Sequence, residues 1–139
     1  MGKIQKIGVT AFILKNNKAL ILKRSESENF LPGYWEMPGG KVEFAESPSE
    51  AIAREVKEET NLEIQAVKPY ALFSYVSENG QRHTVDIQFI AKLLNNKGKI
   101  KISGAHSDYK WIAGGEIEKY KFSDSMKKSI ISGFQETRS

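Results

Sequence analysis

Hydrophobic and polar residues alternate along residues 4–15, which predicts a β-strand with one buried face. The segment KALILKR, residues 18–24, has a similar composition and follows the turn signal formed by Asn16 and Asn17. Two such runs separated by a short turn are typical of a hairpin. We therefore expect the chain to begin with an antiparallel pair of strands.

The second half of the chain repeats this pattern. Two long alternating runs are separated by the turn sequence ENGQ, and shorter β-rich runs follow. Phe73 and Phe89 lie within the long runs and are expected to fill the core. The pattern predicts strands over residues 63–76 and 82–94, and near 99–102 and 108–112.

A helix is predicted between these two groups of strands. Ser47 is the expected N-cap, Pro48 suits the first helical position, and Glu50 completes a capping box. The helical pattern reaches about Thr60. It ends at Asn61, a residue that tolerates the left-handed conformation of a helix C-cap.

Residues 25–34 are polar and predict a loop, and residues 35–44 look extended but are interrupted by Pro38, Gly39 and Gly40. A second helix is predicted over residues 123–135, beginning at Ser123 or Asp124. Two helices among several strands predict an α/β fold in which a mixed sheet lies between helices. The chain shows no repeat or linker, so residues 1–139 are expected to form one domain.

Composition narrows the function classes. The net charge is only +4 and the basic residues are scattered, so nucleic acid is not an expected partner, whereas a nucleotide would suit this balance. The absence of cysteine excludes disulfides, thiolate metal sites and thiol nucleophiles. No apolar run or secretory leader indicates a membrane or export, so a cytoplasmic location is expected.

The glutamates of the first helix are candidates for chemistry. Glu55, Glu58 and Glu59 stand at i, i+3 and i+4 and therefore share one helix face. A solvated acidic face is the ordinary interpretation, but like charges at this spacing weaken a helix. Converging carboxylates supply the hard oxygen ligands that Mg²⁺ or Mn²⁺ prefers. Gly39 and Gly40 lie next to them and would let the backbone approach a ligand closely.

Residues 40–62 resemble the Nudix box, the signature of the Nudix hydrolases, and the flanking sequence PGYWEMPGGKVE resembles the MutT-like branch. One position departs from the motif, where Asn61 replaces the final glycine; since Asn tolerates a left-handed cap, the fold is expected to be retained. The resemblance implies an α/β/α sandwich. The matching positions are Gly40, Glu46, Arg54, Glu55, Val56, Glu58, Glu59 and Leu62.

The resemblance also implies a reaction, the divalent-metal-dependent hydrolysis of a nucleoside diphosphate linked to another group. It implies Mg²⁺, with Mn²⁺ as an alternative, held by Glu55, Glu58 and Glu59 beside the carbonyl of Gly39. Either Glu55 or Glu59 would accept the proton of the attacking water. Arg54 either orients these carboxylates or is a surface cation.

Substrate contacts are expected outside the helix, while Glu46 is expected to act behind the metal ligands. The resemblance places a phosphate-binding arginine at Arg24, where the alternative is a solvated strand end. Trp35, with Tyr34, would either stack on a base or belong to the core. Asp124 would read a purine edge or serve as the N-cap of the last helix.

The segment GAHSDYKWI departs from the family pattern. Relatives often carry a glutamate immediately before the histidine, and here that position is Ala105, followed by His106. Asp108 is the nearest carboxylate that could replace it as base or ligand. The alternatives are a solvated Asp108 and a base supplied by the box itself.

These features favour a MutT-like, Mg²⁺-dependent nucleotide pyrophosphohydrolase. It would cleave a (deoxy)nucleoside triphosphate, an oxidised one included, to the monophosphate and pyrophosphate. An ADP-ribose or nucleotide-sugar pyrophosphatase is the alternative, followed by a Nudix-fold nucleotide sensor without turnover. A sensor would not need all the box carboxylates, which this chain retains. A monomer and a homodimer are both compatible with the sequence.

Overall fold

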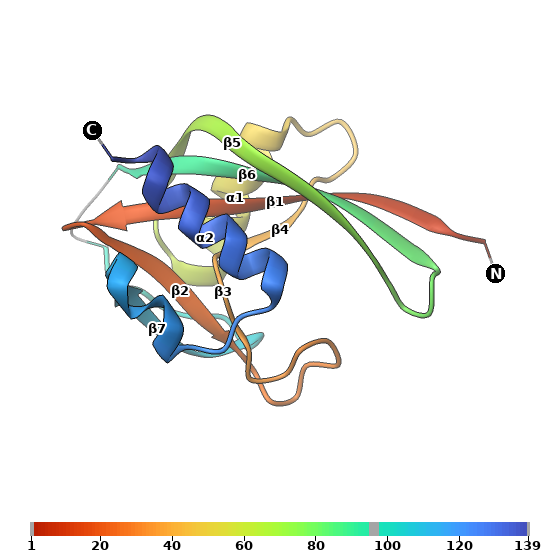
Figure 1. The fold of residues 1–139 in the computed structure, drawn as a ribbon. Helices are drawn as coiled ribbons and strands as arrows, with labels where there is room; N and C mark the ends of the chain where they lie inside the picture. The colour runs from red at the N-terminus through yellow and green to blue at the C-terminus, as the bar shows by residue number, and fades with distance from the viewer. Residues whose placement is uncertain (1, 95–97, 139) are drawn as a thin grey trace.

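A computed structural model of the chain describes residues 2–94 and 98–138. Its strands form one mixed sheet in the order β3-β2-β1-β6-β5, with β4 paired to β1 and β7 paired to β2 (Figure 1). β1 pairs in parallel with β6, and the other pairs are antiparallel. The elements are β1 (Ile4–Lys15), β2 (Lys18–Arg24), β3 (Trp35–Glu36), β4 (Gly39–Lys41), α1 (Pro48–Thr60), β5 (Ile64–Ser77), β6 (Arg82–Leu93), β7 (His106–Ile112), the 3₁₀ helix η1 (Gly114–Lys119) and α2 (Asp124–Glu136).

The two longer helices cover opposite faces of this sheet, with α2 in front and α1 behind in Figure 1. Along β1, Val9, Ala11 and Ile13 face a core that includes Ile52 of α1. Phe12 faces the other way, into a second core that includes Ile130 of α2. Burial of alternate residues on both sides of one strand confirms the predicted α/β sandwich.

Helix α1 follows its sequence signals closely. The hydroxyl of Ser47 accepts a hydrogen bond from the backbone of Glu50, whose carboxylate accepts the backbone N–H of Ser47 in return. The helix ends at Asn61, which adopts the left-handed conformation at φ 67° and ψ 9°. The predicted start, end and capping of this helix are confirmed.

The strand predicted near residues 99–102 is absent, because the described part of this segment binds the end of α1 instead. The N–H of Lys101 donates to the carbonyl of Thr60 at 3.0 Å, and that of Ser103 donates to the carbonyl of Glu59 at 3.1 Å. These backbone groups therefore satisfy the last helical carbonyls rather than a neighbouring strand. The helix η1 was not predicted either.

The β5–β6 hairpin and the start of β1 project beyond the helices (Figure 1). The turn between β5 and β6 has positive φ at Glu78, Asn79 and Gly80, in agreement with the predicted ENGQ turn. Phe89 is buried as expected, but Phe73 is only partly buried, because it lies where the sheet extends past its helical cover. Within the described residues, neither helix has the length and apolarity that a bilayer crossing requires.

Candidate active site at the glycine turn and helix α1

The glycine turn of β4 lies against the carboxylates of α1. The N–H of Gly39 donates to Oε1 of Glu59 at 2.9 Å, and the N–H of Lys41 donates to Oε2 of Glu55 at 3.3 Å. A Cβ on Gly40 would overlap the Glu55 carboxylate. Only glycine therefore allows this carboxylate to lie directly against the backbone of β4.

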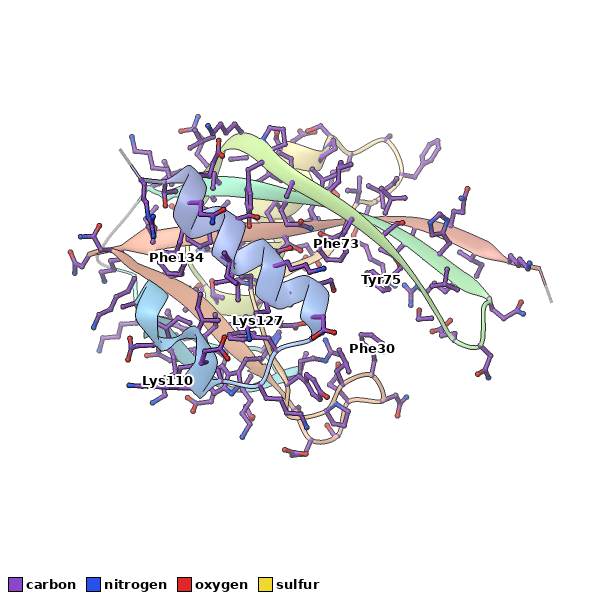
Figure 2. The ribbon with its side chains drawn as sticks, viewed as in Figure 1. Phe30, Phe73, Tyr75, Lys110, Lys127 and Phe134 are labelled. Atoms are coloured by element: carbon purple, nitrogen blue, oxygen red, sulfur yellow. The ribbon has the colours of Figure 1, made fainter. Side chains whose placement is uncertain are left out.

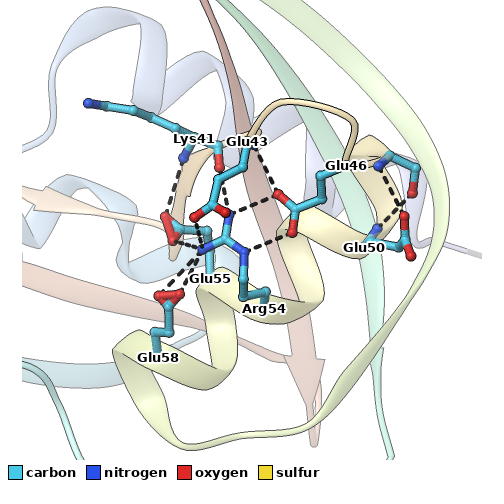
Figure 3. Close-up of polar contacts among 8 residues, drawn as sticks. Lys41, Glu43, Glu46, Glu50, Arg54, Glu55 and Glu58 are labelled. Atoms are coloured by element: carbon cyan, nitrogen blue, oxygen red, sulfur yellow. Dashed lines mark hydrogen bonds and ion pairs between the residues drawn. The ribbon is translucent and has the colours of Figure 1, made fainter.

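Arg54 connects the remaining carboxylates of the box (Figure 3). Its Nε and Nη2 donate to the two oxygens of Glu46 at 2.8 and 3.0 Å. Its Nη1 donates to Glu55 at 2.8 Å and to Glu58 at 2.7 Å, and Nη2 also reaches the carbonyl of Lys41 at 2.9 Å. Arg54 is thus placed to orient the carboxylates, as one of the two sequence interpretations requires.

The electrostatic environment differs among these glutamates. Hydrogen bonding to Arg54 lowers the pKa of Glu46 to about 2. Burial raises the pKa of Glu55, and it raises that of Glu59 well above the ordinary value, with the charge of Glu36 adding to the effect. The cost of burial therefore outweighs the favourable charge of Arg54 at Glu55 and of Arg24 at Glu59.

The donor set fits a divalent metal ion in its chemistry. Glu55, Glu58 and Glu59 supply hard carboxylate oxygens, as Mg²⁺ and Mn²⁺ prefer. Among the described residues, however, no group of three acidic or histidine side chains converges on one point. The reason is that Glu58 turns toward Arg54 while Glu59 is bonded to Gly39. A ligand role for these residues therefore stays a prediction.

A second polar group lies beside this centre and consists of Arg24 and His106, which the sequence analysis named, and Glu36, which it missed. Glu36 accepts hydrogen bonds from Nη1 of Arg24 at 3.2 and 3.3 Å, and its Oε2 lies 2.8 Å from Nε2 of His106. The His106 side chain is only 2% exposed, and its Nδ1 is buried without a hydrogen-bond partner among the residues that the structure describes. Glu36 and His106 are distant in the sequence and follow no motif spacing, so no local signal joins them.

Arg24 has its donors engaged on the protein. Besides Glu36, it donates through Nε to the carbonyl of Phe30 at 2.7 Å and through Nη2 to Glu28 at 3.3 Å. A phosphate would have to displace Glu28 or Glu36 to reach this guanidinium. Arg24 thus holds the loop of residues 25–34, and its predicted phosphate contact stays a prediction.

The aromatic residues are distributed differently from the expectation. Trp35 packs edge-on against Tyr120, with 5.2 Å between ring centroids, and belongs to the core on the α2 side. Of its two interpretations the packing supports the core role, and stacking on a base stays a prediction. A partly accessible group of rings is formed instead by Phe30, Tyr75 and Phe73 (Figure 2). Phe30 and Tyr75 are 49% and 38% exposed.

Neither aspartate proposed from the sequence joins the box carboxylates. Asp108 is exposed on β7, and its Oδ1 accepts the backbone N–H of Tyr109 at 2.7 Å. Asp124 is exposed in the first turn of α2, whose N-cap is Ser123 and not Asp124. Glu36, by contrast, is a carboxylate whose charge contributes to the raised pKa of Glu59.

The fold and site together define a protein of the Nudix class. A model of the NUDIX domain matches residues 5–131, and the chain therefore belongs to the Nudix family. Members of this family generally use divalent metal ions.

Individual proteins of known name also resemble this chain in sequence or structure. A solved MutT protein from Methanosarcina mazei Go1 superposes with a TM-score of 0.80 at 26% identity, covering 98% of this chain and 96% of that one. The nucleoside triphosphatase NudI of Escherichia coli is 23% identical, over 91% of this chain and 94% of the relative. An ADP-ribose pyrophosphatase from Methanocaldococcus jannaschii is 33% identical over 67% of this chain, which spans only 54% of that relative's length.

Proposed function

We propose that the protein is a Mg²⁺-dependent nucleotide pyrophosphohydrolase that converts a (deoxy)nucleoside triphosphate to the monophosphate and pyrophosphate. The observation that carries this proposal is the seating of Glu55 and Glu59 against the glycine turn, with Arg54 fixing the adjacent glutamates. This arrangement concentrates carboxylate oxygens where the backbone of β4 permits close approach. A polyphosphate bound through metal ions matches such a centre.

Glu55, Glu58 and Glu59, with the carbonyl of Gly39, would hold Mg²⁺ or Mn²⁺. The ion would neutralise phosphate charge and acidify a bound water. Glu59 is suited to accept the proton of that water at Oε2, since Oε1 is fixed by the N–H of Gly39. The water oxygen would bond to the α-phosphorus while the bond from that phosphorus to the bridging oxygen breaks and pyrophosphate leaves.

A nucleotide-sugar pyrophosphatase is the second candidate. It is favoured by the similarity to the Methanocaldococcus jannaschii ADP-ribose pyrophosphatase. Both activities break a phosphoanhydride bond and would use the same carboxylates. The two differ in the group beyond the diphosphate, so the residues of the box do not separate them.

The deciding experiment is a panel of nucleoside triphosphates, ADP-ribose and nucleotide sugars incubated with Mg²⁺ and separated by chromatography. We expect triphosphates to yield monophosphate and pyrophosphate. Release of AMP and ribose 5-phosphate from ADP-ribose, with triphosphates untouched, would replace the proposal by the second candidate. No turnover of any substrate would indicate a nucleotide sensor.

Two variants test which residue acts as the general base. Glu59→Gln should lower kcat by roughly 10²- to 10⁴-fold, the usual cost of losing a general base. Asp108→Asn should leave kcat unchanged, because Asp108 is exposed and bonded to its neighbour. Glu63→Gln, an exposed glutamate paired with Lys57, is the matched control. If Asp108→Asn lost as much kcat as Glu59→Gln, the base would move to Asp108.

A further inference from the structure

A continuous aromatic surface extends from the loop of residues 25–34 onto the open part of the sheet. The Phe30 and Tyr75 rings stack with 6.3 Å between centroids at an interplanar angle of 12°, and Phe73 lies 6.1 Å beyond Tyr75 (Figure 2). Phe30 is linked to the polar group of Arg24 and Glu36, because its backbone carbonyl accepts a hydrogen bond from Arg24. Flat, partly exposed rings of this kind present a stacking surface for a planar ligand.

A buried carboxylate lies at the sheet end of this surface. Asp86 is directly opposite Phe73 in the β5–β6 pairing and is only 8% exposed. Its Oδ1 is saturated by the hydroxyl of Thr10 at 2.8 Å and by Nε2 of Gln88 at 2.6 Å. Its Oδ2 accepts no hydrogen bond from the residues that the structure describes.

Gly8 keeps this free oxygen in place. It pairs with Asp86 across β1 and β6, and a Cβ at Gly8 would lie 2.6 Å from Oδ2. Oδ2 therefore lies over the backbone of Gly8. Gly8, Asp86 and Phe73 occupy one cross-strand row of the sheet. Because no donor among the described residues occupies this oxygen, it can accept a hydrogen bond from a ligand.

The surface and the box carboxylates are close enough to act on one substrate. Thr10, whose hydroxyl donates to Asp86, pairs with Gly39 across β1 and β4. The N–H of Gly39 in turn donates to Glu59, so one pair of neighbouring backbone positions joins Asp86 to the box carboxylates. A nucleotide whose phosphates occupy the Glu59 side would carry its base toward the rings and Asp86.

We propose that Oδ2 of Asp86 is a specificity-determining acceptor for the exocyclic amino group of a nucleobase stacked on Phe30 and Tyr75. This inference rests on the proposed function and adds the substrate class: nucleotides of adenine, guanine or cytosine are selected over those of uracil, thymine or hypoxanthine. An amino group donates to a carboxylate, whereas the carbonyl oxygen that replaces it in uracil or hypoxanthine is repelled. Rejection is stronger still because the buried acceptor then stays unpaired.

Two matched substrate pairs test the inference, CTP against UTP and ATP against ITP. Within each pair a single amino group is exchanged for a carbonyl. A hydrogen bond to a charged acceptor predicts that kcat/KM favours the amino member by about 10- to 100-fold. Equal use of both members by the wild-type protein would overturn the inference.

Asp86→Asn provides the second arm. The amide keeps an acceptor for Thr10 and Gln88 and presents an N–H group where Oδ2 was, so both ratios should fall to about one or invert. Unchanged ratios in a variant with a normal unfolding transition would contradict the assignment. Leu72→Ala, one residue from Phe73 and exposed, is the control and should keep the wild-type ratios.

Phe30→Ala tests the stacking surface separately. It should raise KM about tenfold for all four substrates without altering the ratios, because every base has a face to stack. The matched control is Phe44→Ala, which removes a fully exposed phenylalanine from another loop. Equal KM values for the Phe30→Ala and wild-type proteins would remove the rings from the proposal.

Failure of the proposed function would be distinguishable. If none of the four triphosphates is hydrolysed, the hydrolase proposal fails, and calorimetry with CMP and UMP in EDTA still measures the selectivity. Tighter binding of CMP that is lost in Asp86→Asn would support the inference. Equal binding of the two monophosphates, or binding of neither, would overturn it.

Discussion

At the scale of single residues, Arg54 determines the direction of the box carboxylates. One guanidinium binds Glu46 through two nitrogens and also reaches Glu55 and Glu58. Its planar fork can do so because the donors are fixed relative to one another. The charge is equally important, since the like-charged glutamates on one helix face would otherwise repel each other. Arg54 thus stabilises the helix and prepares the site at once.

Replacing Arg54 by lysine keeps the charge but removes the fork. We expect Arg54→Lys to weaken Mn²⁺ binding and kcat by about 10- to 100-fold, the usual effect of losing a group that orients metal ligands. Titration with Mn²⁺ and steady-state kinetics measure the two quantities. Lys57→Gln, on the exposed side of the same helix, is the control. If Arg54→Lys kept the wild-type affinity for Mn²⁺, Arg54 would be only a surface cation and not a residue that orients the ligands.

Asp86 makes a separate prediction about stability and pH. Burial raises its folded-state pKa above the ordinary value of 3.8, so the folded protein binds this proton more tightly than the unfolded chain. The free energy of unfolding therefore loses this contribution as the pH rises from the unfolded pKa through the raised folded pKa. Asp86→Asn cannot ionise and should gain stability relative to wild type across that window.

Urea unfolding at pH 3.5 and pH 7 measures the effect. The difference in unfolding free energy between Asp86→Asn and wild type should move in favour of the variant at pH 7. A difference that does not change with pH would show that Asp86 titrates normally in the folded protein.

At the scale of elements, α1 is specified by signals at its own ends. Ser47 and Glu50 cap each other, and Asn61 turns the chain out of the helix in the left-handed conformation. The N–H of Asn61 donates to the carbonyl of Lys57 at 2.9 Å. This termination sets the direction in which the chain enters β5. The residue that departs from the Nudix motif therefore preserves the geometry that glycine would give.

Asn61→Ala should lower the free energy of unfolding by about 1–2 kcal/mol, because a Cβ without a polar side chain disfavours the left-handed region. Asn61→Gly should be close to neutral, since glycine is the usual residue at this position. Urea unfolding of both variants distinguishes these outcomes. Equal loss in the two would assign the role to the Asn61 side chain, whose amide reaches the carbonyl of Lys99 at 3.4 Å.

The difference between local and distant contacts explains what the sequence could predict. The helix caps and turns are encoded within a few residues, so α1, the first hairpin and the ENGQ turn were predicted correctly. The association of Glu36 with His106 spans 70 residues and depends on how β3 and β7 flank β2. The segment near 99–102 has strand-like residues, but its backbone N–H groups donate hydrogen bonds to the free carbonyls at the end of α1 instead of to a strand. For Trp35 the sequence left base stacking and a core role open, and its packing with the core on the α2 side depends on contacts distant in the sequence.

At the scale of the whole molecule, the fold does not depend on the metal centre. The two cores lie on either side of the sheet and consist of apolar side chains. The box carboxylates already have protein partners in Arg54, Gly39 and Lys41. Each of these carboxylates keeps a protein hydrogen bond when a metal ion is removed, so we expect the fold to persist.

EDTA should abolish turnover while circular dichroism stays unchanged. Adding Mn²⁺ should restore activity and raise the midpoint of thermal unfolding in proportion to the logarithm of its concentration, as expected for a ligand that binds the folded state. Full activity in EDTA would refute the metal-dependent mechanism. Loss of secondary structure in EDTA would instead assign the metal a structural role.

The glycine turn and α1 are neighbours in the sequence, whereas Gly8, Phe30, Phe73 and Asp86 come from four separated segments. The proposed hydrolytic centre therefore lies within one short stretch of sequence. The residues proposed to set the nucleotide selectivity are distributed over the rest of the chain. Single substitutions on β5 and β6 could change the substrate preference without altering the glycine turn and α1. Directed evolution confined to those strands should accordingly yield new nucleotide preferences more readily than loss of hydrolysis.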